Sequence, residues 1–203
     1  MKDSFDKYIY IEIGVDKISS SNKFFFKNRD KQWTFELFEP NIHTKSRIEK
    51  GIRKLRKRGV NVNFHEVGAY SSNTTMKLYP GNGKKGQSQE SSTFYKGRVS
   101  FKVKYDSGFK IRCIDFDEWV KKNLNKEHYI YMKMNAEGAE YEILPKMIEG
   151  GSIDYINSVH IYFHYYKFDE KNGKRFKKKH DFLKEFFLKR EFDIKRLKGM
   201  DGL

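Results

Sequence analysis

The chain contains very little cysteine and proline. Cys113 is its one cysteine, and proline occurs three times in 203 residues. A single cysteine excludes an intramolecular disulfide and a multi-cysteine metal site, and it fits a reducing compartment such as the cytoplasm. Because glycine and proline are not in excess and aromatic residues make up 16% of the chain, the composition also excludes a disordered chain.

Long apolar runs are missing as well. No run approaches the roughly 18 residues that would indicate a membrane span. The first residues, MKDSFDKYIYIEIG, lack a basic segment followed by a long apolar stretch, so no secretory signal is predicted. We therefore expect a cytoplasmic chain without a membrane span, and the length predicts a single domain over residues 1–203.

Acidic residues are the minority among the charged residues. Forty-two Lys and Arg face 27 Asp and Glu, which gives a formal net charge of +15. Such a charge favours polyanionic partners, namely nucleic acid, anionic lipid headgroups or acidic glycans. The alternative is a lysine-rich proteome with AT-biased codons, in which the charge has no binding role.

The apolar pattern alternates between strand and helix periods. Strands are predicted at residues 8–15, 32–41, 60–70, 128–135, 156–166 and 192–197, and helices at 45–59, 115–124, 137–151 and 175–192. Strands that alternate with helices predict an α/β, Rossmann-like fold with a mostly parallel sheet flanked by helices. The strand-like pieces within 71–113 interrupt this order, so we expect a β-rich insertion there.

Polar residues and glycines gather where the predicted strands end. They are Glu12 and Gly14, Glu39, Gly68 and Ala69, Asn135 and Glu137, and His164. Ligands of open parallel sheets bind beyond the carboxyl ends of the strands. Glu39, after the second strand, is a candidate to accept hydrogen bonds from ribose hydroxyls, and the alternative is a carboxylate that stabilises the N-terminus of the next helix.

The segment YIYMKMNAEGAEYEIL resembles the signature of FkbM-type methyltransferases, in which a strand ends in Lys-x-Asp-x-Glu-Gly-x-Glu and a helix follows. The match falls on Lys133, Asn135, Glu137, Gly138, Glu140 and Leu144. Further pieces resemble the family in the same order: IYIEIGVD, FELFEPN, VNVNFHEVGAYSS, SST at 91–93, CIDFDEWV and VHIYFHYY. The resemblance covers about residues 8–166.

This resemblance implies a Rossmann-like domain that binds S-adenosylmethionine and methylates a hydroxyl oxygen. The cofactor-binding residues that it implies are Glu12, Gly14, Asp16, Glu39, Pro40, Gly68, Ala69 and Asn135. Lys133 would stabilise a developing alkoxide, Glu137 or His164 would take the proton, and Asn135 would orient the acceptor or the cofactor. No metal is implied.

Structural alternatives exist for the catalytic candidates. Lys133 and Glu137 could form an ion pair that fixes the strand-to-helix corner. His164 could be a packed histidine in an aromatic cluster, and His160, on the same face but further from the strand end, is a weaker candidate.

The chain departs from the family pattern at three places. Ile18 stands where the first loop usually has a second glycine, and it could crowd the methionine end of the cofactor. Asn135 replaces the Asp of the signature, which removes a carboxylate. The antiparallel strand pair that usually ends this class of methyltransferase is visible only as FDIKRL.

Two basic segments are candidates for binding nucleic acid or another polyanion. They contain Lys50, Arg53, Lys54, Arg56, Lys57 and Arg58, and Lys174, Arg175, Lys177 and Lys178. Each cation could neutralise one phosphate. The leading hypothesis is an O-methyltransferase acting on RNA, another anionic acceptor or a sugar, and the alternative is an inactive methyltransferase-like module that binds nucleic acid or a protein partner.

Overall fold

The main sheet is parallel throughout. The computed structural model describes residues 5–15, 18–81, 92–99, 103–190 and 193–198. Six strands lie in the order β3-β2-β1-β7-β8-β9, and every neighbouring pair is parallel. They are β1 (Lys7–Ile13), β2 (Trp33–Phe38), β3 (Asn61–His65), β7 (His128–Met134), β8 (Ser158–Tyr162) and β9 (Asp193–Lys198). The predicted fold class is confirmed, but FDIKRL forms a parallel edge strand instead of part of an antiparallel pair.

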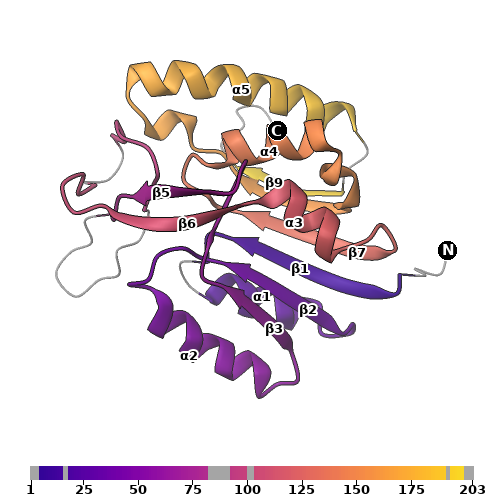
Figure 1. The fold of residues 1–203 in the computed structure, drawn as a ribbon. Coiled ribbons are helices and arrows are strands. Elements are labelled where there is room, and N and C mark those ends of the chain that lie inside the picture. The colour runs from indigo at the N-terminus through magenta and orange to yellow at the C-terminus, as the bar shows by residue number, and fades with distance from the viewer. Residues whose placement is uncertain (1–4, 16–17, 82–91, 100–102, 191–192, 199–203) are drawn as a thin grey trace.

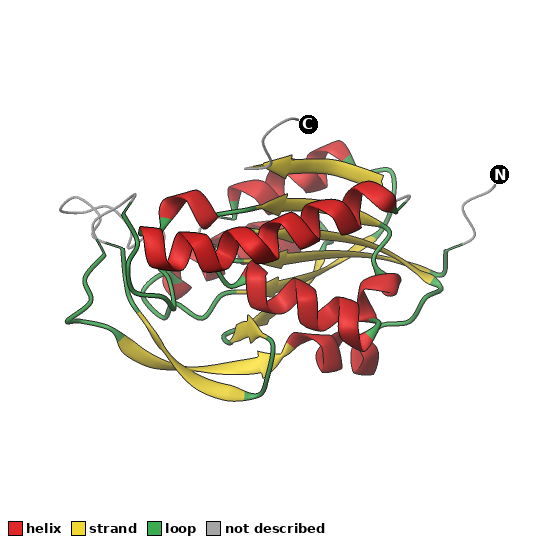
Figure 2. Ribbon diagram, turned by 90° about the horizontal axis from the view of Figure 1, so that it is seen from above, coloured by secondary structure: helices red, strands yellow, loops and turns green. Residues whose placement is uncertain are grey.

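Helices cover the sheet on both sides (Figures 1 and 2). On one side lie α1 (Ser19–Lys27) and α2 (Lys45–Arg56), and on the other lie α3 (Phe116–Asn123), α4 (Glu140–Gly150) and α5 (Glu170–Lys189). Two short 3-10 helices, η1 (Ser152–Tyr155) and η2 (Tyr165–Lys167), border β8. Each side buries its own apolar cluster, and most residues of β1 and β2 are buried on both faces.

The helices predicted at 45–59 and 115–124 are present as α2 and α3. Ile48, Ile52 and Leu55 form the buried stripe of α2. Asp115 caps α3, because its carboxylate accepts the backbone N–H of Glu118 at 3.1 Å.

Helix α1 is not predicted from the sequence, because its run of Ser, Asn and Phe has weak helix propensity. Ile18 immediately precedes α1 and packs on α2: a Cβ placed on Gly51 would lie 2.1 Å from Cγ2 of Ile18. The side chain of Ile18 therefore fixes α1 against α2.

A second sheet of three strands stands beside the main sheet. It has the order β4-β6-β5, from β4 (Gly68–Tyr70), β5 (Thr74–Leu78) and β6 (Phe109–Asp115). The prediction of one strand over 60–70 is wrong, since β3 stops at His65 and the chain crosses to β6. Gly68 permits this crossing, because a Cβ there would lie 2.8 Å from Sγ of Cys113.

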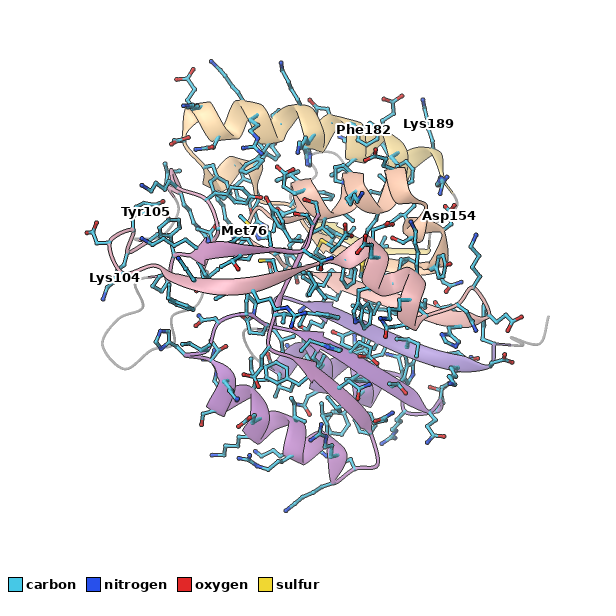
Figure 3. All side chains as sticks on the ribbon, viewed as in Figure 1. Met76, Lys104, Tyr105, Asp154, Phe182 and Lys189 are labelled. Carbon is cyan, nitrogen blue, oxygen red and sulfur yellow. The ribbon has the colours of Figure 1, made fainter. Side chains whose placement is uncertain are left out.

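The predicted β-rich insertion thus spans 68–115 in the structure and closes one end of the molecule. Figure 3 shows Met76 of β5 at the same end as Lys104 and Tyr105. The Tyr105 hydroxyl accepts the backbone N–H of Arg98 at 2.7 Å, and its ring lies 5.3 Å from that of Tyr79. These contacts hold the segment around Arg98 against the second sheet.

Candidate active site

A cavity of about 260 Å³ opens at the carboxyl ends of the strands. Among the described residues, its walls come from the ends of β1, β2, β4 and β7 and from the insertion. They are Ile13, Gly14, Phe38, Glu39, Pro40, Asn41, Thr44, Gly68, Ala69, Ser92, Thr93, Phe94, Asn135, Ala136, Glu137 and Ala139. The site therefore lies where the strand-end argument placed it.

Most of the residues predicted to bind the cofactor line this cavity. Gly14, Glu39, Pro40, Gly68, Ala69 and Asn135 all belong to its walls. Gly14 has φ of +82°, and a Cβ on it would lie 2.2 Å from the Asn135 carbonyl oxygen. Only glycine lets the end of β1 approach the end of β7 this closely. Asp16, also predicted, lies outside the described residues.

Glu39 is nearly buried at the end of β2. One of its carboxylate oxygens, Oε1, accepts the backbone N–H of Asn41 at 2.9 Å. The side chain of Asn41 in turn donates to Oγ of Ser92 at 3.0 Å, so the insertion is tied to the end of β2 across the cavity. The helix N-terminal alternative for Glu39 remains compatible with this geometry, because α2 begins at Lys45.

Glu137 occupies a strained turn between β7 and α4. It has φ of +51°, an unusual conformation for a residue other than glycine, and Gly138 follows with φ of +109°. A Cβ on Gly138 would lie 2.9 Å from the ring of Phe168. Such strain persists only where the surroundings impose it, and it is often found at functional sites.

Two cations and one histidine ring face one oxygen of the Glu137 carboxylate. Oε2 lies 2.7 Å from a guanidinium nitrogen of Arg98, 3.4 Å from Nζ of Lys167 and 3.6 Å from Nε2 of His164. Burial alone would raise the pKa of Glu137, but these charges outweigh burial and lower the pKa below its usual value. Oε1 makes no hydrogen bond or ion pair with any described residue, and Glu137 is one of the residues that line the cavity.

A second carboxylate holds His164. Nδ1 of His164 lies 2.9 Å from Oε1 of Glu140, whose Oε2 accepts the backbone N–H of Gly138 at 2.8 Å. Both side chains are buried. The Tyr141 hydroxyl accepts the backbone N–H of His164 at 3.1 Å. His164 therefore stands between the carboxylates of Glu140 and Glu137 instead of filling an aromatic cluster.

Four polar residues of the site were not predicted from the sequence. The Thr93 hydroxyl donates to the Glu137 carbonyl oxygen at 2.9 Å, and Arg98, Lys167 and Glu140 surround Glu137 and His164. Glu140 and Thr93 belong to pieces that carried the family resemblance, so a signal for them existed. Arg98 and Lys167 had none, because their approach depends on the path of the insertion and of the turn after β8.

Lys133 and Glu12 do not reach this cavity. Nζ of Lys133 lies 2.6 Å from Oε1 of Glu12, and the hydroxyls of Tyr10 and Ser21 donate to Oε2 of Glu12 at 2.9 and 2.6 Å. Glu12 and Lys133 are paired residues of neighbouring parallel strands, so their side chains lie on the same face of the sheet. Ser21 belongs to α1, so this face is the α1 side. The expected Lys133–Glu137 ion pair is therefore wrong.

The basic segments differ in how far their charges are already paired. In α5, the cations of Lys174, Arg175 and Lys177 form ion pairs with Glu170, Glu142 and Asp181. On α2, Arg56 donates to the Val62 carbonyl oxygen and Arg58 to the side chain of Asn22. The exposed side chains of Lys50, Arg53, Lys54 and Lys57 make no ion pair with any described residue. The α2 face therefore offers more free positive charge than α5.

Two further features concern the whole described chain. None of the helices in the described ranges is both long and apolar enough to span a membrane. Across the same ranges, no three His, Cys, Asp or Glu side chains are grouped so as to hold a metal ion.

The parallel sheet, the glycine turn after β1, the acidic end of β2 and the cavity above them define a Rossmann-like methyltransferase. The family model described as "Methyltransferase FkbM domain" matches residues 12–194, and the chain belongs to this family. It is therefore an S-adenosylmethionine-dependent methyltransferase, as the signature at 129–144 implied. No curated protein and no solved structure matches the chain.

The cavity fits this cofactor in its chemistry. It combines a buried carboxylate, Glu39, with a turn at Gly14 where no side chain intrudes and with apolar walls from Phe38 and Phe94. A carboxylate suits ribose hydroxyls, and apolar walls suit an adenine ring. Ile18 is not among the described residues that line the cavity, and its side chain lies against Gly51 of α2.

Proposed function

We propose that this methyltransferase transfers the methyl group to a hydroxyl oxygen of an anionic acceptor, and that Glu137 receives that hydroxyl. The observation that carries the proposal is the Glu137 carboxylate, which has Arg98, Lys167 and the His164 ring around Oε2 and no described partner on Oε1. A hydroxyl is the natural donor to such an oxygen.

Residues of the cavity would hold the cofactor beside this carboxylate. Glu39 would accept hydrogen bonds from the ribose, the backbone around Gly14 and Gly68 would line it closely, and Asn135 would orient its methionine end through the side-chain amide. When bound, S-adenosylmethionine supplies a methyl group on a sulfonium, which is an excellent leaving group for in-line displacement. The protein then has mainly to align the hydroxyl and to remove its proton.

The proton would leave through Glu137 and His164. The acceptor oxygen becomes strongly acidic as its bond to the methyl carbon forms, so a carboxylate of low pKa suffices as the base. Nε2 of His164 lies 3.6 Å from Oε2 of Glu137, and Glu140 fixes the opposite ring nitrogen. Arg98 and Lys167 keep Glu137 ionised before the acceptor arrives.

The charge of the protein supports an anionic acceptor, either RNA or a charged sugar. The free lysines and arginine on α2 are the main contribution, since the cations of α5 are largely paired. Radiolabelled methyl transfer to RNA and to a panel of sugars distinguishes these two classes.

The test of the site is Glu137→Gln, which keeps the shape and removes the charge. We expect methyl transfer to fall by roughly 10²- to 10⁴-fold, the usual contribution of a general base. Binding of S-adenosylhomocysteine, measured by calorimetry, should change little. Glu149→Gln, an exposed position on the same helix α4, is the matched control.

Unchanged transfer in Glu137→Gln would contradict the proposed role of this carboxylate. Loss of S-adenosylhomocysteine binding in Glu137→Gln, with Glu149→Gln unaffected, would indicate that Glu137 binds the cofactor and not the acceptor.

A further inference from the structure

A second and larger hollow lies on the other side of the sheet from α3, α4 and α5. It measures about 860 Å³ and shares no described lining residue with the cavity above the strand ends. Helix α1 forms one wall, and the floor is the α1-side face of β7 and β8. We call this hollow the sheet groove.

The floor of the sheet groove differs in kind from the opposite face of the same strands. The covered face carries fully buried aliphatic side chains: Ile130, Met132, Met134, Val159 and Ile161. The groove face carries aromatic rings with polar tips and one cation: Tyr129, Tyr131, Lys133, His160 and Tyr162. Except for Lys133, these groove residues are only half-buried. A face meant to receive another helix would carry aliphatic residues, as the covered face does.

The rings of the floor are held in fixed positions. The rings of His160 and Tyr162 are stacked with centroids 5.0 Å apart, and Nζ of Lys133 lies 5.9 Å from the centroid of Tyr162. The Tyr131 ring packs against Phe24 of α1 at 4.7 Å. Binding to such rings requires little ordering of side chains, which favours affinity.

Lysines border these rings. Lys23 and Lys27 project from successive turns of α1, are exposed and make no ion pair with any described residue. Nζ of Lys31 lies 4.4 Å from the Tyr8 ring centroid. Asp30 is the one acidic residue among the described lining residues. Glu12, which pairs with Lys133, does not line the groove. The sheet groove is therefore aromatic and positively charged.

We propose that the sheet groove binds single-stranded nucleic acid, with bases against the floor around Tyr162 and phosphates at Lys23 and Lys27. Aromatic rings on a sheet bind unstacked bases, and flanking cations follow the backbone. The floor is long enough for more than one base, since the five residues from Tyr129 to Lys133 in a strand span about 13 Å. The groove ends at Lys133, two residues before Asn135, so a strand lying in it leads toward the cavity. The binding itself requires neither cofactor nor methyl transfer.

The experiment measures fluorescence anisotropy of a labelled oligouridylate of roughly twelve nucleotides at several salt concentrations. The variants are Lys23→Ala/Lys27→Ala and Tyr162→Leu. The control is Lys171→Ala/Lys184→Ala, which removes two lysines from α5 that are not among the candidates for binding nucleic acid. Helix α5 carries Phe182 and Lys189 on the opposite side of the molecule (Figure 3). Thermal unfolding of each variant checks that the fold is kept.

We expect the Lys23/Lys27 variant to reduce the salt slope of log K by roughly 1.4, because each lost phosphate contact on a single strand contributes about 0.7. Tyr162→Leu should weaken binding roughly tenfold with the slope unchanged, as expected for one lost stacking contact. The α5 control should bind as the unaltered protein does.

Three results would overturn the proposal. The first is unaltered binding in both groove variants. The second is competition by heparin or duplex RNA that is as effective as competition by the unlabelled single strand. That result would indicate that binding depends on charge alone and involves no contact with the bases. The third is a concentration-dependent dimer in sedimentation that Tyr162→Leu dissociates, since the groove would then be covered by a second copy of the chain.

Discussion

Two charged clusters lie at the end of β7, only four residues apart in sequence, and they are built differently. On the α1 side, Lys133 and Glu12 form a buried pair in which the Glu12 carboxylate is fully engaged by an ammonium and two hydroxyls. On the insertion side, Glu137 has two cations and a histidine around one oxygen, no described cation on the other, and a strained backbone.

This difference indicates that charged residues at a strand end can have two separate roles. In the Lys133 cluster both oxygens of Glu12 already accept hydrogen bonds, and burial raises the pKa of the Tyr10 hydroxyl well above its ordinary value, which keeps it a donor to Glu12. The Glu137 cluster borders a cavity and is incomplete without a donor from outside. We infer that the first cluster stabilises the fold and the second performs chemistry.

The largest effect that separates the two clusters is on stability. Lys133→Met leaves Glu12 buried without its counter-charge, and we expect the free energy of unfolding to fall by about 3–5 kcal/mol. Adding Glu12→Gln removes the orphaned charge and should restore most of the loss. Urea denaturation measures both variants.

Activity of the double variant then tests the comparison. Glu12→Gln/Lys133→Met should retain methyl transfer, because neither side chain lines the cavity. If the double variant is folded and inactive, Lys133 belongs to the reacting side and the comparison fails.

An intermediate effect concerns the pH dependence of methyl transfer. Glu137 must be ionised to accept a hydroxyl, its pKa is lowered in the folded protein, and activity is therefore present above that pKa and lost as pH falls through it. Arg98→Met removes the nearest charge, so the pKa should rise and the acidic limb of the pH–rate profile should move to higher pH.

Two controls bracket this shift. Lys167→Met should shift the limb less, since Nζ of Lys167 lies further from Glu137 and burial already lowers its own pKa. Arg175→Met, whose partner is Glu142, should not shift it. An acidic limb that stays in place in Arg98→Met would mean that a group other than Glu137 limits the rate.

Sequence reasoning located the cavity because parallel strands end at one edge, and Gly14, Glu39 and Gly68 mark three of those ends. It could not tell which residues of β7 face the cavity. Both faces of this strand are apolar or aromatic, so the alternation of side chains does not separate a ligand side from a core side. Lys133 was therefore grouped with Glu137, although the fold separates them.

Sequence reasoning also missed the partners of Glu137. Arg98 and Lys167 lie 39 and 30 positions from Glu137 in the chain, and they reach it only because the insertion and the turn after β8 fold over the end of β7. Hydrophobic periodicity fixes which elements form, but it carries no information about where such connections pass.

The smallest effect concerns Ile18, which departs from the family pattern without entering the cavity. Ile18→Ala should change the affinity for S-adenosylmethionine by less than about threefold, or under 0.7 kcal/mol. It should lower stability by roughly 1–2 kcal/mol, because the side chain is only half-buried against α2.

Gly51→Ala should destabilise the protein more than Ile18→Ala, since its Cβ would lie 2.1 Å from Cγ2 of Ile18. In the double variant, Ile18→Ala should relieve that clash. Calorimetry and urea denaturation measure the two quantities separately. A tenfold gain in cofactor affinity in Ile18→Ala would instead indicate that the Ile18 side chain restricts the cofactor site. The cofactor would then reach α1, and the Lys133 cluster as well as the Glu137 cluster would lie next to a ligand.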